Sequence, residues 1–269
     1  MLSFTGPQKL RKLSFLRVKR LGSGDVRLTP TEDSALETLI IESCPTKALT
    51  FVSPEKYVQL RTLEINDIEA TEIPDSLFFL PSLESLTMKN GKFIFVPAAI
   101  VQLTKLKSLT FDRSAISIIH DNLCKVTSLE DFSASGTKLM WLPDCIGNLT
   151  NLIKLNIGNN WIIALPDSFC QLTKLESLFV SSSFSHSFFF RLHTVIIPFC
   201  CNSSGFFNAL KSLPTNFGNL ASLRVLNLMD NFLTKIPDSF SNLKQLTSVF
   251  VIILNSSSKD NLCSSYYFS

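Results

Sequence analysis

The sequence predicts an α/β solenoid: an arc of stacked coils with a parallel sheet on its concave side and short helical or irregular segments on its convex side. Leucines recur every 23 residues through six units, which begin at Leu60, Leu83, Leu106, Leu129, Leu152 and Leu175. Most units also contain the spacing of one short strand followed, several residues later, by a proline. A coil of this size cannot bury its own apolar side, so neighbouring coils must stack around one shared core.

The unit from Leu152 to Lys174, LIKLNIGNNWIIALPDSFCQLTK, follows the pattern most fully. Leu155 and Ile157 alternate with polar residues, which is the period of a strand with one buried face. Pro166 ends the extended segment with its fixed φ, and the apolar residues after it turn a short helical or irregular stretch back over the core. One strand per unit is therefore expected.

The ninth position of each unit is expected to carry a buried polar side chain. Asparagine occupies it in three units, at Asn160, Asn208 and Asn231. Its amide would satisfy backbone groups that no regular ladder reaches. Other units place smaller polar residues there, at Cys44, Ser114 and Thr137. Ile68 and Gly91 lack a suitable side chain, so we expect the amino-terminal coils to be less rigid.

Charges alternate in sign at the second position of the first five units, at Glu37, Arg61, Glu84, Lys107 and Glu130. In a parallel stack, strands lie about 4.8 Å apart, and these side chains become lateral neighbours. The column then either forms ion pairs between coils or is an ordinary solvated edge. Both interpretations remain open from the sequence.

The chain divides into five segments by pattern. Residues 1–35 are a basic amino-terminal cap or a degenerate repeat, with seven basic residues and one acidic residue before position 31. Regular repeats occupy 36–182 and resume over 208–251. Between them, 183–207 is an aberrant insertion with seven phenylalanines and a single formal charge. Its in-frame length and composition support the hypothesis of a retained intron. Residues 252–269 are expected to be an aberrant tail.

These patterns resemble the leucine-rich repeat family in its 23-residue "LP" type, which is similar to intracellular Ras-pathway scaffolds and plant Ras-group relatives. The resemblance covers roughly residues 36 to 251. Its proline position recurs at Pro74, Pro97, Pro143, Pro166, Pro214 and Pro237. The resemblance implies a non-catalytic protein-interaction scaffold in intracellular signalling. It also implies a protein partner on the concave face, such as a small GTPase or a signalling phosphatase.

The candidate binding residues are the variable strand positions that such an arc displays on its concave face. They are small or polar and of mixed charge: Thr62, Glu64, Asn66, Ser85, Thr87, Lys89, Ser108, Thr110, Asp112, Arg113, Asp131, Ser133, Lys154 and Asn156. A merely solvated face is the alternative, because few aromatic anchors accompany these residues.

No motif for catalysis, a cofactor or a metal is recognised, so we expect no enzyme activity, no cofactor and no metal site. His120 stands at a proline position and is expected to be structural, while His186 and His193 lie in the insertion. The basic segment lacks a nucleic-acid motif, so no nucleic-acid partner is expected. Arg191 and His193 interrupt the apolar run of the insertion, so no stable membrane span is expected.

The chain begins without the apolar run of an export signal, which predicts a cytoplasmic location. Its seven cysteines show no paired spacing, so most are expected to be small buried side chains in a reducing compartment. Two alternatives to the scaffold remain. One is the recognition arm of a larger enzyme, such as a kinase, phosphatase or ubiquitin ligase. The other is an extracellular receptor module. The oligomeric state is not predicted.

Overall fold

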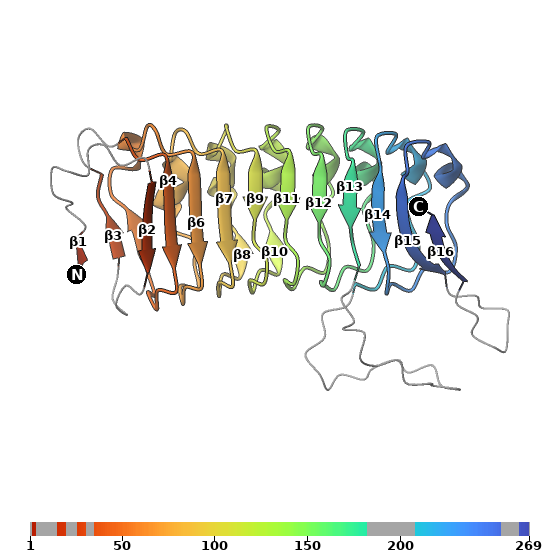
Figure 1. Ribbon diagram of the computed structural model, residues 1–269, viewed down its shortest axis with the longest axis horizontal. Helices are drawn as coiled ribbons and strands as arrows, with labels where there is room; N and C mark the ends of the chain where they lie inside the picture. Colours follow the sequence, from red (N-terminus) through yellow and green to blue (C-terminus); the bar gives the residue numbers. More distant parts are fainter. Residues whose placement is uncertain are drawn as a thin grey trace.

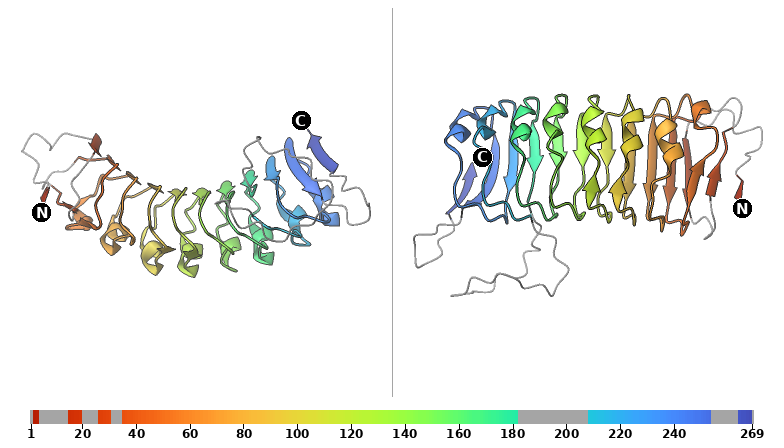
Figure 2. Two further views of the ribbon diagram at one scale, coloured as in Figure 1. Left: turned by 90° about the horizontal axis from the view of Figure 1, so that it is seen from below. Right: turned by 180° about the vertical axis from the view of Figure 1, so that it is seen from behind.

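The computed structural model describes residues 2–3, 15–19, 26–30, 35–181, 208–253 and 264–268 of the chain. Successive coils stack side by side into one row (Figure 1). The long sheet lines the concave side of the arc, and short helical turns cover the convex side (Figure 2). This arrangement confirms the predicted α/β solenoid.

The long sheet contains eleven strands among the described residues, in the order β16-β15-β14-β13-β12-β11-β9-β7-β6-β4-β2. Every adjacent pair is parallel except β15 and β16. The strands are β2 (Phe15–Lys19), β4 (Thr38–Glu42), β6 (Thr62–Asn66), β7 (Ser85–Lys89), β9 (Ser108–Thr110), β11 (Asp131–Ser133), β12 (Lys154–Asn156), β13 (Ser177–Phe179), β14 (Val225–Leu228), β15 (Ser248–Ile253) and β16 (Ser264–Phe268). The register keeps equivalent repeat positions side by side, as in Leu63, Leu86 and Leu109.

The convex side carries short 3₁₀ helices, one in each described coil from η2 onward. They are η2 (Pro54–Lys56), η3 (Asp75–Phe79), η4 (Ala98–Gln102), η5 (Asp121–Lys125), η6 (Ile146–Asn148), η7 (Asp167–Gln171), η8 (Phe217–Asn219) and η9 (Asp238–Asn242). Proline immediately precedes four of them, at Pro74, Pro97, Pro166 and Pro237. Proline suits the start of these helices because its φ is fixed and because it has no N–H that would be left unpaired there.

The core runs without interruption through the described coils between the sheet and the convex helices. The strand leucines Leu86, Leu109, Leu155 and Leu178 are all fully buried. On the convex side, Phe217 stacks between two phenylalanines of the neighbouring coils, with ring centroids 6.5 Å from Phe169 and 6.2 Å from Phe240. Each large side chain buried in this way contributes roughly 1.5–3 kcal/mol.

The predicted asparagine position is confirmed in the coils that have it. Asn160 donates through Nδ2 to the carbonyl oxygens of Ala134 at 2.7 Å and Ile157 at 3.0 Å. Its Oδ1 accepts the N–H of Leu139 at 3.0 Å. Equivalent bonds to backbone groups of two coils are made by Asn208 and Asn231. Each amide thus links its own coil to the preceding one.

Ser114 takes over part of this task where the neighbouring coil has no polar side chain. Its Oγ donates to the carbonyl oxygen of Met88 at 3.1 Å, and it accepts the N–H of Gly91 at 3.4 Å. At the same repeat position, Ile68 is buried and joins the apolar core. The hydroxyl of Ser114 makes these two hydrogen bonds, which is fewer than the amide of Asn160 makes.

The expectation of one strand per coil is wrong for several coils. Two small parallel sheets lie outside the long sheet, with the orders β1-β3-β5 and β10-β8. Their strands are β1 (Leu2–Ser3), β3 (Val26–Leu28), β5 (Leu49–Phe51), β8 (Phe95–Val96) and β10 (Ile118–Ile119). The short strands β8 and β10 lie behind the lower ends of β7 and β9 (Figure 1). In these coils, stacking brings the extended segment that follows the turn of the main strand next to its counterpart in the next coil, and the two pair.

The two ends of the repeat array differ in how they complete the sheet. Within residues 1–35, β2 pairs in parallel with β4, and β3 pairs with β5, so this segment supplies the strands of one further coil. Within 252–269, the segment expected to be an aberrant tail, β16 pairs antiparallel with β15. The antiparallel direction shows that β16 is a returning strand and not a further coil. The insertion at 183–207 lies outside the described residues.

Candidate interaction surface on the concave face

The fourteen predicted residues lie together on the concave side, and none of them is buried. Strand pairing arranges them in two main rows across the sheet. One row contains Glu64, Thr87, Thr110, Ser133 and Asn156. The other contains Thr62, Ser85, Ser108, Asp131 and Lys154. Asn66 and Lys89 end their strands as direct neighbours. Asp112 and Arg113 follow β9 at the strand ends.

The middle of this face holds charges of both signs. Asp112 accepts hydrogen bonds through Oδ1 from the Ser133 hydroxyl at 2.6 Å and from the Ser135 N–H at 3.0 Å, which fixes its carboxylate over the neighbouring coil. Asp131 lies one strand away in the other row. Partial burial raises the pKa of Asp131, and the negative Asp112 adds to the rise while Lys154 opposes it. A cationic group from a partner would relieve this cost.

Arg113 is held in a left-handed backbone conformation with φ 55°. The same repeat position is left-handed in six other coils, where the residues are Ser43, Asp67, Asn90, Gly136, Asn159 and Asp230. The turn lets the N–H of Arg113 donate to the carbonyl oxygen of Ser135 in the next coil at 2.8 Å. Small or short polar residues tolerate this conformation, whereas a long side chain is disfavoured there by about 1 kcal/mol.

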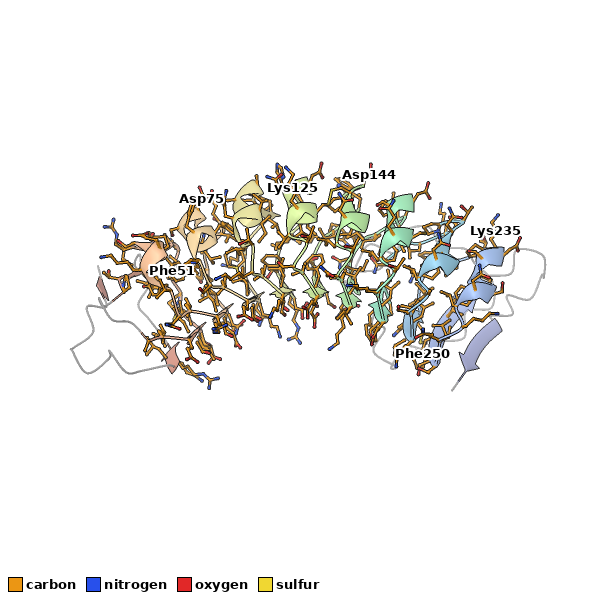
Figure 3. The ribbon with its side chains drawn as sticks, turned by 90° about the horizontal axis from the view of Figure 1, so that it is seen from above. Phe51, Asp75, Lys125, Asp144, Lys235 and Phe250 are labelled. Carbon is orange, nitrogen blue, oxygen red and sulfur yellow. A yellow bond between two sulfur atoms is a disulfide. The ribbon has the colours of Figure 1, made fainter. Side chains whose placement is uncertain are left out.

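Aromatic side chains that the sequence prediction missed extend the face toward its carboxy-terminal end. Phe179 is 37% exposed, and it stands in the same row as Asn227 and Phe250. Figure 3 shows Phe250 on the concave side, away from Lys125 on the convex side. The signal was the repeat itself, since Phe179 stands 23 residues after Asn156 in that row. Exposed aromatics of this kind are the usual anchors of protein interfaces.

The alternating column at the second repeat position forms ion pairs between coils. Glu84 contacts both Arg61 and Lys107, the latter at 3.1 Å, and Arg224 lies 3.9 Å from Glu176. The hydrogen bond from Lys107, followed by that from Arg61, lowers the pKa of Glu84. The lateral pairing proposed from the sequence is therefore confirmed at these contacts. Because the side chains are solvated, the pairs fix register more than they add stability.

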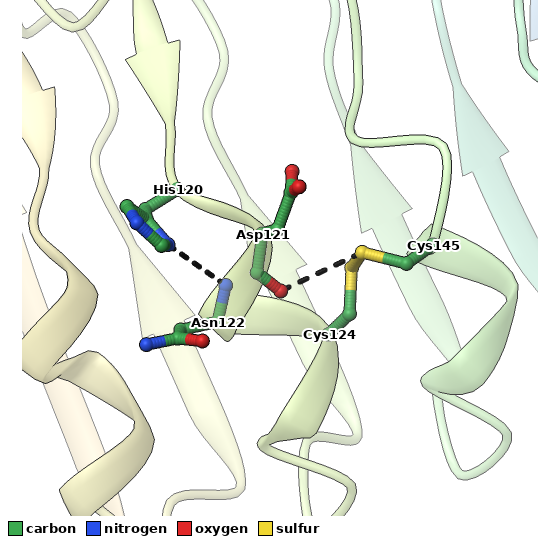
Figure 4. The surroundings of a disulfide bond; sticks show 5 residues. All are labelled: His120, Asp121, Asn122, Cys124 and Cys145. Atoms are coloured by element: carbon green, nitrogen blue, oxygen red, sulfur yellow. Dashed lines mark hydrogen bonds between the residues drawn. A yellow bond between two sulfur atoms is a disulfide. The ribbon is translucent and has the colours of Figure 1, made fainter.

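The expectation that the cysteines are isolated buried thiols is wrong for two of them. Cys124 and Cys145 form a disulfide with their Cα atoms 5.8 Å apart (Figure 4). The bond joins η5 to the residue before η6, so it ties two neighbouring coils on the convex side. Cys44 and Cys170 are buried free thiols, and burial raises the pKa of Cys170.

His120 has the structural role expected of it. Its Nδ1 accepts the N–H of Asn122 at 3.0 Å, which caps the start of η5 (Figure 4). The side chain therefore replaces the proline that begins the convex helix in other coils. Across the described residues, no three side chains of histidine, cysteine, aspartate or glutamate gather as metal ligands would. None of the helices in that part of the chain has the length and apolar character to cross a bilayer.

Comparison with protein-family models and with curated proteins gives no match. Among solved structures, a leucine-rich repeat protein of Leptospira interrogans superposes with a TM-score of 0.66 and 22% identity, over 90% of this chain and 56% of that one. The leucine-rich repeat ectodomain of the Arabidopsis thaliana membrane receptor kinase GASSHO1/SCHENGEN3, in complex with CASPARIAN STRIP INTEGRITY FACTOR 2, matches with a TM-score of 0.57 and 20% identity, over 85% and 28%. The chain has the leucine-rich repeat fold, and it spans about half or less of the length of these two structures.

Proposed function

We propose that this chain is a non-catalytic protein-interaction module that binds a protein partner on its concave face. Arg113 is the observation that carries the proposal. A long cationic side chain stands there at φ 55°, where six other coils have small or short polar residues. Backbone strain of this kind clusters at functional sites. The neighbouring charges and the exposed Phe179 extend the same face into a surface suited to a protein.

The partner and setting follow from the repeat type. The 23-residue spacing and the recurrent proline are typical of Ras-group scaffolds, which favours a cytoplasmic signalling role and a small GTPase or signalling phosphatase as partner. The mixed charge of the concave centre suits such a partner, because both signs can pair across the interface. If the chain is a part of a longer protein, this surface would instead be the recognition arm of a kinase, phosphatase or ubiquitin ligase.

The disulfide favours a second candidate, an extracellular receptor module. Bonds such as that between Cys124 and Cys145 persist mainly in oxidising compartments. Alkylation of the protein in intact cells, followed by mass measurement, separates the two settings. Protection of both cysteines from alkylation supports the extracellular module, and labelling of both supports the cytoplasmic scaffold.

The proposed binding face is tested by surface plasmon resonance with the full chain immobilised. The probes are small GTPases in both nucleotide states and phosphatase catalytic subunits. Arg113→Asn keeps a residue that tolerates positive φ, and Lys154→Ser removes a charge from an exposed strand position. Each should weaken binding of the true partner by about tenfold.

Lys125→Ser is the matched control, because Lys125 is an exposed lysine on η5 of the convex side. The Lys125→Ser variant should bind the partner with the same affinity as the parent chain. Binding that is lost in the convex variant and retained in both concave variants would contradict the proposed face. Binding of none of these probes would contradict the proposed partner class while leaving the concave face open to other proteins.

A further inference from the structure

A band of exposed apolar side chains crosses four neighbouring coils on the flank behind the long sheet. We call this band the apolar stripe; its members are between 41% and 59% exposed, and they are Ile94, Phe95, Ile118, Met140, Trp141, Trp161 and Ile163. Between them, the buried Phe93, Ile116, Leu139 and Ile162 point into the core. The stripe is therefore an outward surface that the core does not need.

Backbone pairing makes the stripe continuous. Ile118 is the register partner of Phe95 in the β8–β10 pair. The N–H of Ile163 donates to the carbonyl oxygen of Met140 at 3.4 Å, and that of Trp161 donates to Leu139 at 2.8 Å. The N–H of Lys138 donates to the carbonyl oxygen of Ile116 at 2.8 Å, which joins the two middle coils. Successive coils of the stripe thus lie about 5 Å apart. The side chains form one patch and not scattered surface residues.

The size of the stripe suits an interface between proteins. Seven large apolar side chains, each about half exposed, present roughly 600 Å². That area reaches the upper end of the largest apolar patch on a typical monomer. With a charged rim, it approaches the roughly 800 Å² per partner of a standard interface.

Charges at the two ends of the stripe have opposite signs. Glu69 and Glu72 are exposed in the coil before it, where Glu69 lies 3.9 Å from Lys92, while Lys211 and Lys235 are exposed in the two coils after it. Glu72 and Asp75 line a hollow of about 540 Å³ at the acidic end together with Lys47. Lys235 lines a second hollow, of about 270 Å³, at the basic end. A surface with an acidic end and a basic end is complementary to itself when turned by 180°.

We infer that the stripe binds a second copy of this chain in a two-fold symmetric dimer. The axis passes between the coils that begin at Leu106 and Leu129, so that Ile118 of each copy meets Trp141 of the other. The same rotation brings Glu72 of each copy toward Lys211 of the other, because both are equally many coils from the axis. Every contact then occurs twice, which is the property of an interface formed by one patch on both subunits.

A membrane surface fits the stripe less well. Anionic lipid headgroups attract lysines, and Lys211 and Lys235 would suit them, but the exposed Glu69 and Glu72 at the other end would be repelled. The dimer instead places Glu72 of each copy opposite Lys211 of the other. It also leaves the concave face free, so the inference does not depend on the proposed partner there.

Sedimentation velocity of the full chain between about 1 and 100 µM tests the dimer. The dissociation constant of the dimer is measured for the parent chain and for each variant. The parent chain should change from monomer to dimer over this range. Trp141→Glu should raise the dissociation constant by about tenfold or more. The matched control is Phe79→Glu, because Phe79 is similarly exposed, at 55%, on η3 outside the stripe. It should leave the constant unchanged, and circular dichroism should show equal folding of both variants.

Charge exchange gives a second, independent measurement. Glu72→Lys and Lys211→Glu should each weaken the dimer, and the double variant should return the dissociation constant to within about threefold of the parent value. A parent chain that stays monomeric at the highest concentration overturns the inference. A dimer that is unaffected by Trp141→Glu, or not restored by the double variant, overturns it equally. A monomer that floats with anionic vesicles would assign the stripe to a membrane instead.

Discussion

Replacement of Asn160 by alanine should destabilise the protein far more than the loss of one polar surface residue. The amide of Asn160 is fully buried and donates to the carbonyl oxygens of Ala134, Ile157 and Gly158, at 2.7, 3.0 and 3.2 Å. It also accepts the N–H of Leu139 at 3.0 Å. Alanine leaves these backbone groups without their partner in an apolar interior.

The magnitude follows from the number of groups affected. Each buried hydrogen bond that loses one partner costs about 1 kcal/mol or more. Three carbonyl oxygens, one N–H and the hydroxyl of Thr137, which also donates to Asn160 Oδ1, are involved, and entering water recovers part of the loss. We therefore expect the free energy of unfolding to fall by about 3–5 kcal/mol, measured by urea denaturation.

Two further variants separate hydrogen bonding from other effects. Asn160→Leu refills the volume but makes none of the bonds, so it should be no more stable than the alanine variant. Asn151→Ala removes two exposed bonds, from Asn151 Nδ2 to the carbonyl oxygen of Thr127 and from Lys174 Nζ to Asn151 Oδ1, both at 2.8 Å, and should cost about 1 kcal/mol at most. The reasoning is refuted if Asn160→Leu recovers most of the stability, or if Asn160→Ala costs no more than Asn151→Ala.

Four other substitutions have expected outcomes. Arg113→Gly should raise the free energy of unfolding by about 1 kcal/mol, seen as a higher Tm, because glycine accepts the left-handed φ without strain. Replacing both Cys124 and Cys145 by serine should lower the free energy of unfolding by roughly 2–4 kcal/mol. A reductant should lower the free energy of unfolding of the parent chain by the same amount and leave that of the double variant unchanged. Gly147→Ala should lower the free energy of unfolding by about 2 kcal/mol or more in chemical denaturation, since the added Cβ would lie 2.1 Å from the carbonyl oxygen of Ser168. Glu84 has its pKa lowered by Lys107 and Arg61, so its stabilising contribution is present above the unfolded pKa and is lost as the pH falls through the folded one. Glu84→Gln should accordingly reduce the loss of stability between neutral and acid pH.

The sequence predicted those features of the fold that repeat with each coil. The 23-residue period places Leu63, Leu86 and Leu109 in direct register, because one coil of constant length per strand leaves no other alignment. The same period placed Asn160 and Asn231 in the core, since each stands at the ninth position of its unit, in the turn after the strand. Lateral ion pairs such as Lys107 with Glu84 were predictable for the same reason.

Features that break the repeat were not predictable in this way. The antiparallel strand β16 has no period to reveal it, since it does not continue the coil pattern. Phe179 and Phe250 were missed for another reason: the variable strand positions were assigned only as far as Asn156, before the insertion. The left-handed φ of Arg113 was also not foreseen, because arginine gives no local signal for that conformation.

The convex side shows why the disulfide could have been inferred from the repeat but not from cysteine spacing. Cys124 and Cys145 stand 21 residues apart, a spacing that does not match the 23-residue period of the repeat. In the stack they are the nineteenth position of one coil and the seventeenth of the next. Gly147 and Ser168 hold the same two positions one coil later, where a glycine Cβ would lie 2.1 Å from the serine carbonyl oxygen. Neighbouring coils thus approach closely at both junctions, and the chain has a covalent bond at one and a glycine at the other.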